Sequence, residues 1–237
     1  MGTADFSVFL IDDDPGVLKA LTRLLQTAGY KTKAFSSSEA FLDEHDPSVP
    51  GCAVLDLTMP GLDGLEVQQK LAGKATRRPI VFLTGHGNVP VSVRAMKAGA
   101  VDFLLKPVNR DDLLEAVERA AALDKVTRRI DAERRTIYAL LEKLTPRERE
   151  VLTHVIAGRL NKQIAADLGT VEKTIKVHRS RMMAKMGVRT VAALVRLTQK
   201  VPLQPGQPAN AFGPKANSTR RPKRAQISAH ADSDRGR

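Results

Sequence analysis

The first half of the chain alternates short apolar runs with amphipathic stretches, and this alternation constrains its fold more than any other feature. The amphipathic stretches carry apolar residues at helical spacing, as at Val17, Leu21 and Leu24. Repeated strand–helix units predict a parallel sheet with helices on both faces. The apolar runs occupy residues 6–11, 31–35, 53–57, 80–84 and 101–105. We therefore expect an α/β, doubly wound, five-stranded parallel sheet within residues 1–124.

Polar side chains stand at the carboxyl ends of four predicted strands, the edge where open parallel sheets bind ligands. They are Asp12, Asp13 and Asp14 after the first strand, Asp56 at the third, Thr84 at the fourth and Lys106 at the fifth. Carboxylates gathered at one edge repel each other unless a cation neutralises them. Oxygen ligands suit Mg²⁺. With a hydroxyl and an ammonium beside them, these groups are suited to accepting a phosphoryl group and shielding its charge.

Each of these residues also has a purely structural explanation. Acidic residues after strands often cap helices, and Asp14, which precedes Pro15, is expected to be such a cap. A single Thr84 or Lys106 would be incidental. Their coincidence at four strand ends favours a functional site.

The charge of the chain is divided unevenly. Residues 1–124 hold 13 basic and 17 acidic side chains, whereas residues 125–200 hold 18 basic and 7 acidic, and the net charge of the whole is +12. A strongly basic second half indicates a polyanionic partner, with an ordinary solvated cationic surface as the alternative. Cys52 is the single cysteine, which excludes an internal disulfide. No apolar run is long enough to span a membrane, and we expect a cytoplasmic protein.

The second half divides into three parts. Residues 125–143 predict a charged helix, which is either a connecting linker helix or a short coiled coil. Residues 144–200 predict an all-α domain that begins at the capping box of Thr145 and Glu148. Residues 201–237 are rich in Pro, Gly, Ser and Arg and predict a disordered basic tail. This tail either adds non-specific DNA affinity or is a functionless extension.

A helix predicted over about 172–186 has two distinct faces. Ile175, Met182 and Met186 form an apolar stripe at helical spacing. The other face holds Lys173, Lys176, Val177, Ser180 and Arg181. A basic, exposed face after a short turn fits the major groove of DNA, although an ordinary solvated helix would look similar.

The strand-end residues lie in motifs that resemble the response-regulator receiver family over about residues 5–124. The motifs are Ile11-Asp12-Asp13-Asp14, the stretch from Asp56 through Pro60 to Gly64, Thr84-Gly85-His86-Gly87 and Lys106-Pro107. The resemblance implies a flavodoxin-like strand order 2-1-3-4-5 and a phosphoacceptor at Asp56. It implies Mg²⁺ bound by Asp12, Asp13, Asp56 and the backbone carbonyl of Thr58.

The same resemblance assigns further roles around the pocket. Thr84 and Lys106 would bind phosphoryl oxygens, and Phe103 would be the switch aromatic coupled to Thr84. Thr58 and His86 would tune how long the phosphate lasts, with His86 either positioning water or capping its loop.

Residues 144–200 resemble the LuxR/FixJ-type helix-turn-helix domain, with Lys176-Val177-His178 at the core of the motif. This resemblance implies base contacts by Lys176, Val177, Ser180 and Arg181, and phosphate contacts by Lys173, Thr174 and Arg179. His178 would be partly packed, and the last helix, at about 191–199, would dimerise or close the core. Two departures are Val171, which occupies a usual Ser/Thr cap position, and Ser180, which replaces a frequently basic residue.

Together the two resemblances identify a two-component response regulator of the LuxR/FixJ type, and not an enzyme. Phosphorylation of Asp56 would reshape the fourth helix (about 88–98) and the fifth strand, drive dimerisation and release inhibitory contacts to the basic domain. The expected partners are a cognate sensor histidine kinase, double-stranded DNA, a second copy when phosphorylated, and RNA polymerase, with no membrane.

Two other functions fit parts of the sequence. A haloacid-dehalogenase-type phosphatase would use Asp12 as nucleophile, with Thr84, Lys106 and Asp111-Asp112 in support, but it leaves Asp56 unexplained. A constitutive DNA-binding protein would use the receiver only for contacts.

Overall fold

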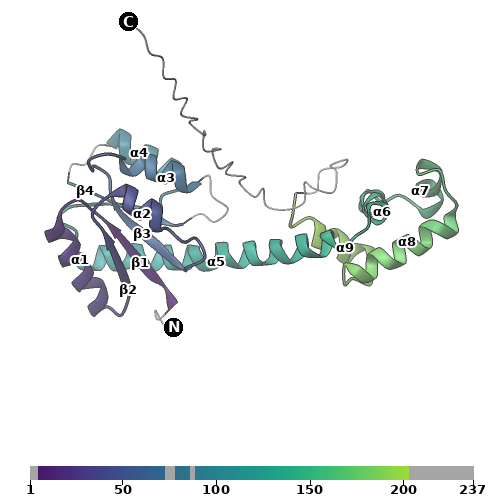
Figure 1. Cartoon of the computed structure of the whole chain (residues 1–237), viewed down its shortest axis with the longest axis horizontal. Helices are drawn as coiled ribbons and strands as arrows, with labels where there is room; N and C mark the ends of the chain where they lie inside the picture. Colours follow the sequence, from purple (N-terminus) through teal and green to yellow (C-terminus); the bar gives the residue numbers. More distant parts are fainter. Residues whose placement is uncertain (1–4, 73–77, 86–88, 203–237) are drawn as a thin grey trace, which may run out of the picture.

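A computed structural model of the chain describes residues 5–72, 78–85 and 89–202. An α/β domain and a smaller helical domain lie at opposite ends of one long helix, α5 (Arg110–Glu142) (Figure 1). Within these residues, no helix is long and apolar enough to cross a bilayer.

The described part of the α/β domain contains a five-stranded sheet in the order β2-β1-β3-β4-β5, with every pair parallel. The strands are β1 (Ser7–Ile11), β2 (Lys31–Phe35), β3 (Gly51–Asp56), β4 (Ile80–Thr84) and β5 (Asp102–Leu105). This confirms the predicted fold class and strand order. The predicted strand ends lie within two residues of the observed ones.

Helices cover both faces of the sheet because successive side chains of a strand point to opposite sides. In β1, Val8 and Leu10 pack under α1 (Pro15–Thr27) and α5, whereas Phe9 and Ile11 face the other layer. That layer consists of α2 (Ser38–Glu44), α3 (Gly64–Ala72) and α4 (Val89–Lys97). The fully buried strands β3 and β4 form the centre of the domain.

Asp14 has the capping role that its position before Pro15 predicts. Its side chain accepts hydrogen bonds from the backbone N–H groups of Gly16 and Val17, at 2.7 and 3.3 Å. Asp14 therefore fixes the start of α1, and its carboxylate is committed to that helix rather than to the acidic pocket.

Helix α5 differs from the prediction of a separate linker helix over residues 125–143. It continues without interruption from Arg110 to Glu142, so the linker is the extension of the last helix of the α/β domain. Its first part is buried in the α/β core, at Leu113 and Val117 among others, and Ile137 and Leu141 belong to the core of the helical domain. One helix therefore contributes to both domains.

The helical domain contains α6 (Pro146–Ile156), α7 (Asn161–Asp167), α8 (Glu172–Lys185) and α9 (Val191–Thr198). The predicted stripe of Ile175, Met182 and Met186 is at most 1% exposed and forms the centre of its core. Val201, predicted to begin the tail, is instead buried in this core, because the chain turns back after α9 through the bond from Val201 N–H to Thr198 O. The predicted tail from 203 onward lies outside the described residues.

Glu148 connects the start of α6 to the end of α8. Its carboxylate accepts hydrogen bonds from the Thr145 N–H (2.8 Å) and from Lys185 Nζ (2.6 Å), and the residue is only 2% exposed. Burial alone would raise the pKa of Glu148, but these two hydrogen bonds outweigh it and hold the pKa below its ordinary value. The predicted capping box is therefore confirmed, and it also joins two helices.

We expect Glu148→Ala to lower the free energy of unfolding of the helical domain by about 1–3 kcal/mol at neutral pH, because the cap and the ion pair are lost together. Since the folded-state pKa is lowered, this contribution is full above the ordinary pKa of 4.5 and disappears as the pH falls through the folded-state value. Urea unfolding of the full chain, followed by circular dichroism, measures it. Glu150→Ala, on the exposed face of α6, is the control and should change stability by less than about 0.5 kcal/mol.

Candidate functional site

Lys106 joins two buried carboxylates at the carboxyl edge of the sheet. Its Nζ donates to Asp12 Oδ2 at 2.6 Å and to Asp56 Oδ2 at 2.7 Å. Asp12 and Asp56 are 1% and 6% exposed, at the ends of β1 and β3. The parallel sheet therefore brings together residues that lie 44 to 94 positions apart in the chain.

Burial and charge act in opposite directions in this pocket. Burial raises the pKa of Asp12, and the hydrogen bond from Lys106 only partly opposes this. For Lys106, burial alone would lower the pKa, but its bonds to Asp12 and Asp56 raise it. The lysine is thus held as a cation, and Asp12 stays a carboxylate only at a cost that a further cation would relieve.

Asp13 completes an acidic cluster with these two residues. Asp12, Asp13 and Asp56 each offer a carboxylate oxygen, and the three oxygens lie within 4.8 Å of one another. Asp13 is exposed, so the cluster opens to solvent on one side. Thr58 lies at the same rim, where its N–H donates to Asp56 Oδ1 at 3.0 Å. A cluster of hard oxygen donors, with one open side, fits a divalent cation such as Mg²⁺.

Thr84 and Phe103 lie on the neighbouring strands β4 and β5. Thr84 is 1% exposed at the end of β4, and its backbone carbonyl accepts a hydrogen bond from Lys106 N–H at 2.8 Å. Phe103 is partly buried, with its ring centroid 6.3 Å from that of Phe82. His86 lies outside the described residues, so its two predicted roles stay predictions.

Gly64 allows α3 to begin directly beside the end of β3. A Cβ at this position would lie 2.8 Å from the carbonyl oxygen of Asp56 and 2.8 Å from the ring of Phe82. The Gly64 N–H donates to Leu57 O at 3.0 Å, which ties the loop after Asp56 back to the strand. The glycine in the motif therefore has a packing reason, because a larger residue would displace the strand end.

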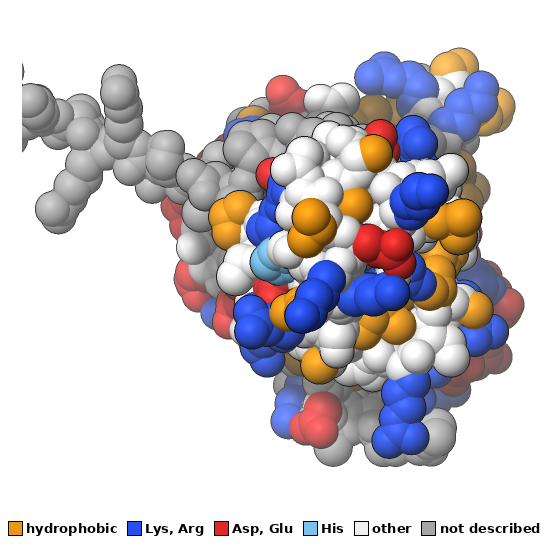
Figure 2. Space-filling view, turned by 90° about the vertical axis from the view of Figure 1, so that its right-hand side faces the viewer, with side chains coloured by type: hydrophobic (Ala, Val, Ile, Leu, Met, Phe, Trp, Pro, Cys, Tyr) orange, Lys and Arg blue, Asp and Glu red, His pale blue; other side chains and the backbone are white. Residues whose placement is uncertain are grey.

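A second cluster of residues lines a shallow depression on α8. It consists of Lys173, Lys176, Val177, Ser180 and Arg181. These are the residues that sequence periodicity places on one face. Figure 2 views the end of the molecule that carries α7 and α8, and Lys and Arg side chains spread across it with apolar and a few acidic groups between them. Lys176 is paired with Glu172 at 3.1 Å within the same helix.

The remaining predicted DNA-contact residues, Thr174 and Arg179, are less exposed and lie partly buried. His178, which was predicted to be partly packed, is partly buried too. The guanidinium of Arg179 donates to Asn161 Oδ1 at 2.8 Å, which joins α8 to the first residue of α7. Val171 has no side-chain hydrogen bond to the first turn of α8, as its apolar character predicts.

Two family models match the two domains that carry these sites. The model of the response regulator receiver domain matches residues 8–118, and the model of bacterial regulatory proteins of the luxR family matches residues 142–198. Among curated proteins, response regulator protein TmoT of Ectopseudomonas mendocina is 41% identical over 85% of this chain and 91% of its own length. Transcriptional regulatory protein FixJ of Rhizobium meliloti is 40% identical over 81% of this chain and 95% of its own.

Solved structures agree with these matches. The response regulator StyR is similar with a TM-score of 0.71 and 43% identity, over 84% of this chain and all of that one. Full-length FixJ of B. japonicum has a TM-score of 0.50 and 39% identity, over 82% of this chain and 96% of that one. The chain belongs to the LuxR/FixJ-type response regulators.

In this response regulator, the sheet assembles the predicted acidic pocket, and α8 presents the predicted basic face. Asn161, which holds Arg179, was not predicted, because nothing in its local sequence distinguishes it from an ordinary first residue of a helix. Glu172 was also not predicted as the partner of Lys176, although the i,i+4 spacing of the two residues is a readable signal.

We expect Asp12→Asn to lower Mg²⁺ affinity by roughly tenfold or more, because a carboxylate of the cluster is lost. The melting temperature should not fall. Because the folded-state pKa of Asp12 is raised, its charge opposes folding as the pH rises above its ordinary value of 3.8, and asparagine removes that charge. Calorimetric titration with MgCl₂ and thermal unfolding measure the two effects.

Asp111→Asn is the matched control for this experiment, because its side chain is 85% exposed on the first turn of α5. Equal Mg²⁺ affinity in the two variants would contradict the assignment of the acidic cluster.

Proposed function

We propose that a sensor histidine kinase phosphorylates Asp56 and that this phosphorylation controls dimerisation and sequence-specific DNA binding, and thereby transcription. The observation that carries the proposal is the contact of Lys106 with Asp56 beside the acidic cluster of Asp12 and Asp13. We place this activity in the cytoplasm, where the DNA partner is found.

The proposed transfer uses Asp56 as the nucleophile. A carboxylate oxygen of Asp56 attacks the phosphorus of the kinase phosphohistidine, the P–N bond breaks, and an aspartyl phosphate forms. Lys106 is already within 2.7 Å of the acceptor carboxylate, and its ammonium offsets charge on the phosphoryl oxygens. Thr84 would donate its hydroxyl to another phosphoryl oxygen. Mg²⁺, held by Asp12, Asp13, Asp56 and the carbonyl of Thr58, would supply the remaining positive charge.

The proposed output begins at Thr84 and Phe103. Movement of Thr84 toward the phosphoryl group would leave space for Phe103, which lies partly exposed on β5 beside α4. The surface of α4 and β5 exposes apolar side chains, namely Val89, Val93, Met96 and Leu105. Exposed apolar residues gathered on two neighbouring elements support a contact surface for a second copy.

Dimerisation would place two α8 helices on neighbouring DNA half-sites. In this proposal Lys176, Val177, Ser180 and Arg181 contact base edges, and Lys173, Thr174 and Arg179 contact phosphates. The DNA-bound dimer would contact RNA polymerase at the promoter. The receiver and α8 lie at opposite ends of α5 (Figure 1), and this separation favours pairing over release of an inhibitory contact as the controlled step.

The two alternatives are less well supported. A phosphatase with Asp12 as its nucleophile gives no role to Asp56, which is only 6% exposed and binds Lys106. A constitutive DNA-binding protein gives no reason for two carboxylates to be buried around one lysine. We therefore propose a regulator and not an enzyme that turns over substrate.

We expect Asp56→Asn to abolish labelling by acetyl phosphate and to remove phosphate-dependent DNA binding. The asparagine amide is no nucleophile for phosphorus, whereas its shape and its contact with Lys106 are largely kept. Radiolabelled acetyl phosphate and mobility-shift titrations measure both, with Asp111→Asn as the charge-matched control. Phosphate-dependent DNA binding that persists in Asp56→Asn would show that the switch is elsewhere.

We expect Lys176→Ala to weaken binding to the preferred DNA by about 1–3 kcal/mol, because a base contact is lost. Lys173→Ala should weaken binding to all sequences alike and reduce the salt slope by about 1, because a phosphate contact is lost. Mobility-shift titrations at several salt concentrations measure both. Arg135→Ala, which removes an exposed charge from α5, is the control and should leave specific binding unchanged.

A further inference from the structure

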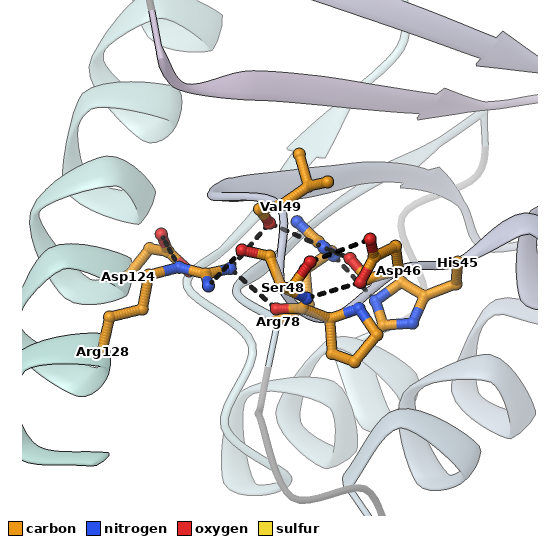
Figure 3. Close-up of polar contacts among 8 residues, drawn as sticks. His45, Asp46, Ser48, Val49, Arg78, Asp124 and Arg128 are labelled. Atoms are coloured by element: carbon orange, nitrogen blue, oxygen red, sulfur yellow. Dashed lines mark hydrogen bonds and ion pairs between the residues drawn. The ribbon is translucent and has the colours of Figure 1, made fainter. Parts of the chain in front are cut away.

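Arg128 binds α5 to the loop before β3 (Figure 3). This loop lies at the end of the sheet opposite the acidic pocket, because β3 begins at Gly51 and ends at Asp56. Its Nε donates to Asp124 Oδ2 at 2.7 Å, one turn earlier in α5. Its two terminal nitrogens donate to backbone carbonyls of the loop: to Ser48 at 3.0 Å, to Pro47 at 3.1 Å and to Val49 at 2.7 Å. One guanidinium thus binds a buried carboxylate and three carbonyls from a segment about 80 residues away.

The loop that Arg128 binds is itself held from the other side by Arg78 (Figure 3). Arg78 donates to His45 Nε2 and to the Asp46 carbonyl, each at 2.8 Å, and to the Val49 carbonyl at 3.1 Å. Its guanidinium stacks on the Phe9 ring at 4.3 Å. Burial lowers the pKa of Arg78 to about 10, so it remains charged at neutral pH. Arg128 therefore binds a loop whose position is fixed by the receiver core.

The contact of Arg128 lies at the point where α5 leaves the receiver. Asp124 is the last residue of α5 that is buried in the receiver, and Ile137 is the first that is buried in the helical domain. None of residues 129–136 is buried. A helical span this short is unstable alone and depends on the structure at its two ends. The contact of Arg128 is thus the last attachment of α5 before the helix leaves the receiver.

We propose that Arg128 is a positioning residue, whose bonds to the loop at 47–49 set the direction in which α5 carries the DNA-binding domain. Through that direction, Arg128 sets how two recognition helices are spaced on paired half-sites, and this last step rests on the proposed function. The loop is also continuous with β3, which begins at Gly51 and ends at Asp56, so the acceptor strand and the exit of α5 share one attachment.

Arginine suits this role because its rigid, forked guanidinium reaches several acceptors at once. Lysine in the same place retains the positive charge and the i,i+4 pairing with Asp124, but a single ammonium cannot reproduce the planar fork to three carbonyls. Arg128→Lys therefore separates the loop contact from the ion pair. It also avoids leaving the buried carboxylate of Asp124 without a cation, which would destabilise the receiver.

The test measures the distance between the two domains in the full chain. Spin labels are attached to Lys19→Cys on α1 and Ala192→Cys on α9, both exposed positions. The native Cys52 is fully buried and its pKa is raised to about 12 by burial, so it does not compete for label. Arg129→Lys is the matched control, since the Arg129 side chain is 82% exposed and pairs with Glu133 of the same helix at 3.6 Å.

We expect Arg128→Lys to broaden the distance distribution and to raise hydrogen exchange in residues 125–136, with Arg129→Lys like the parent chain. The affinity for DNA with paired half-sites should fall by about tenfold, because part of the affinity gained by binding two linked half-sites is lost. The affinity for a single half-site should be unchanged. A distance distribution that is the same in all three proteins would overturn the inference. The DNA titrations use chains treated with acetyl phosphate. If the treated parent chain binds no specific DNA, the proposed function fails, and the distance result still decides the role of Arg128.

Discussion

The receiver domain depends on one ammonium group that lies between two buried carboxylates. Asp12 and Asp56 end neighbouring strands, so their charges would repel each other inside the protein if Lys106 did not bind both. Lys106 follows β5, two strands away from β3 across the sheet. The contact therefore requires the carboxyl ends of β1, β3 and β5 to lie close together at one edge of the sheet. In the proposed function the same contact would make the pocket responsive, because a phosphoryl group on Asp56 would change the charge that surrounds Lys106.

The two ends of the sheet carry different kinds of polar site. At the carboxyl end, carboxylates exceed the cations near them, and the excess is open to solvent through Asp13. At the opposite end, Arg78 and Arg128 donate to backbone carbonyls and Arg128 also binds Asp124, and Arg78 is buried. The first arrangement suits an incoming cation and phosphoryl group. The second suits a fixed connection between a loop and a helix.

The fold and both candidate sites were largely predictable from the sequence, because each depends on a local pattern. Strands β2 and β4 were predicted with their observed bounds, and Asp12, Asp56 and Lys106 were predicted together because strand ends meet at one edge. The continuity of α5 was not predicted, since its apolar face changes from one core to another near residue 125 and the charged sequence between them looks like a boundary. The contacts of Arg128 with residues 47–49 were not predictable either. They use backbone carbonyls, which carry no sequence signal.

The continuity of α5 also has a geometric consequence for how a chain like this can change length. Along an unbroken helix, each added residue advances the far domain by about 1.5 Å and turns it by about 100°. An insertion of one residue between 129 and 136 would therefore point the DNA-binding face in another direction while hardly altering its reach. Only insertions near whole turns, such as seven residues, restore the original facing. The number of residues between the domains is thus limited mainly by the rotation that each residue adds, and less by the distance that it adds.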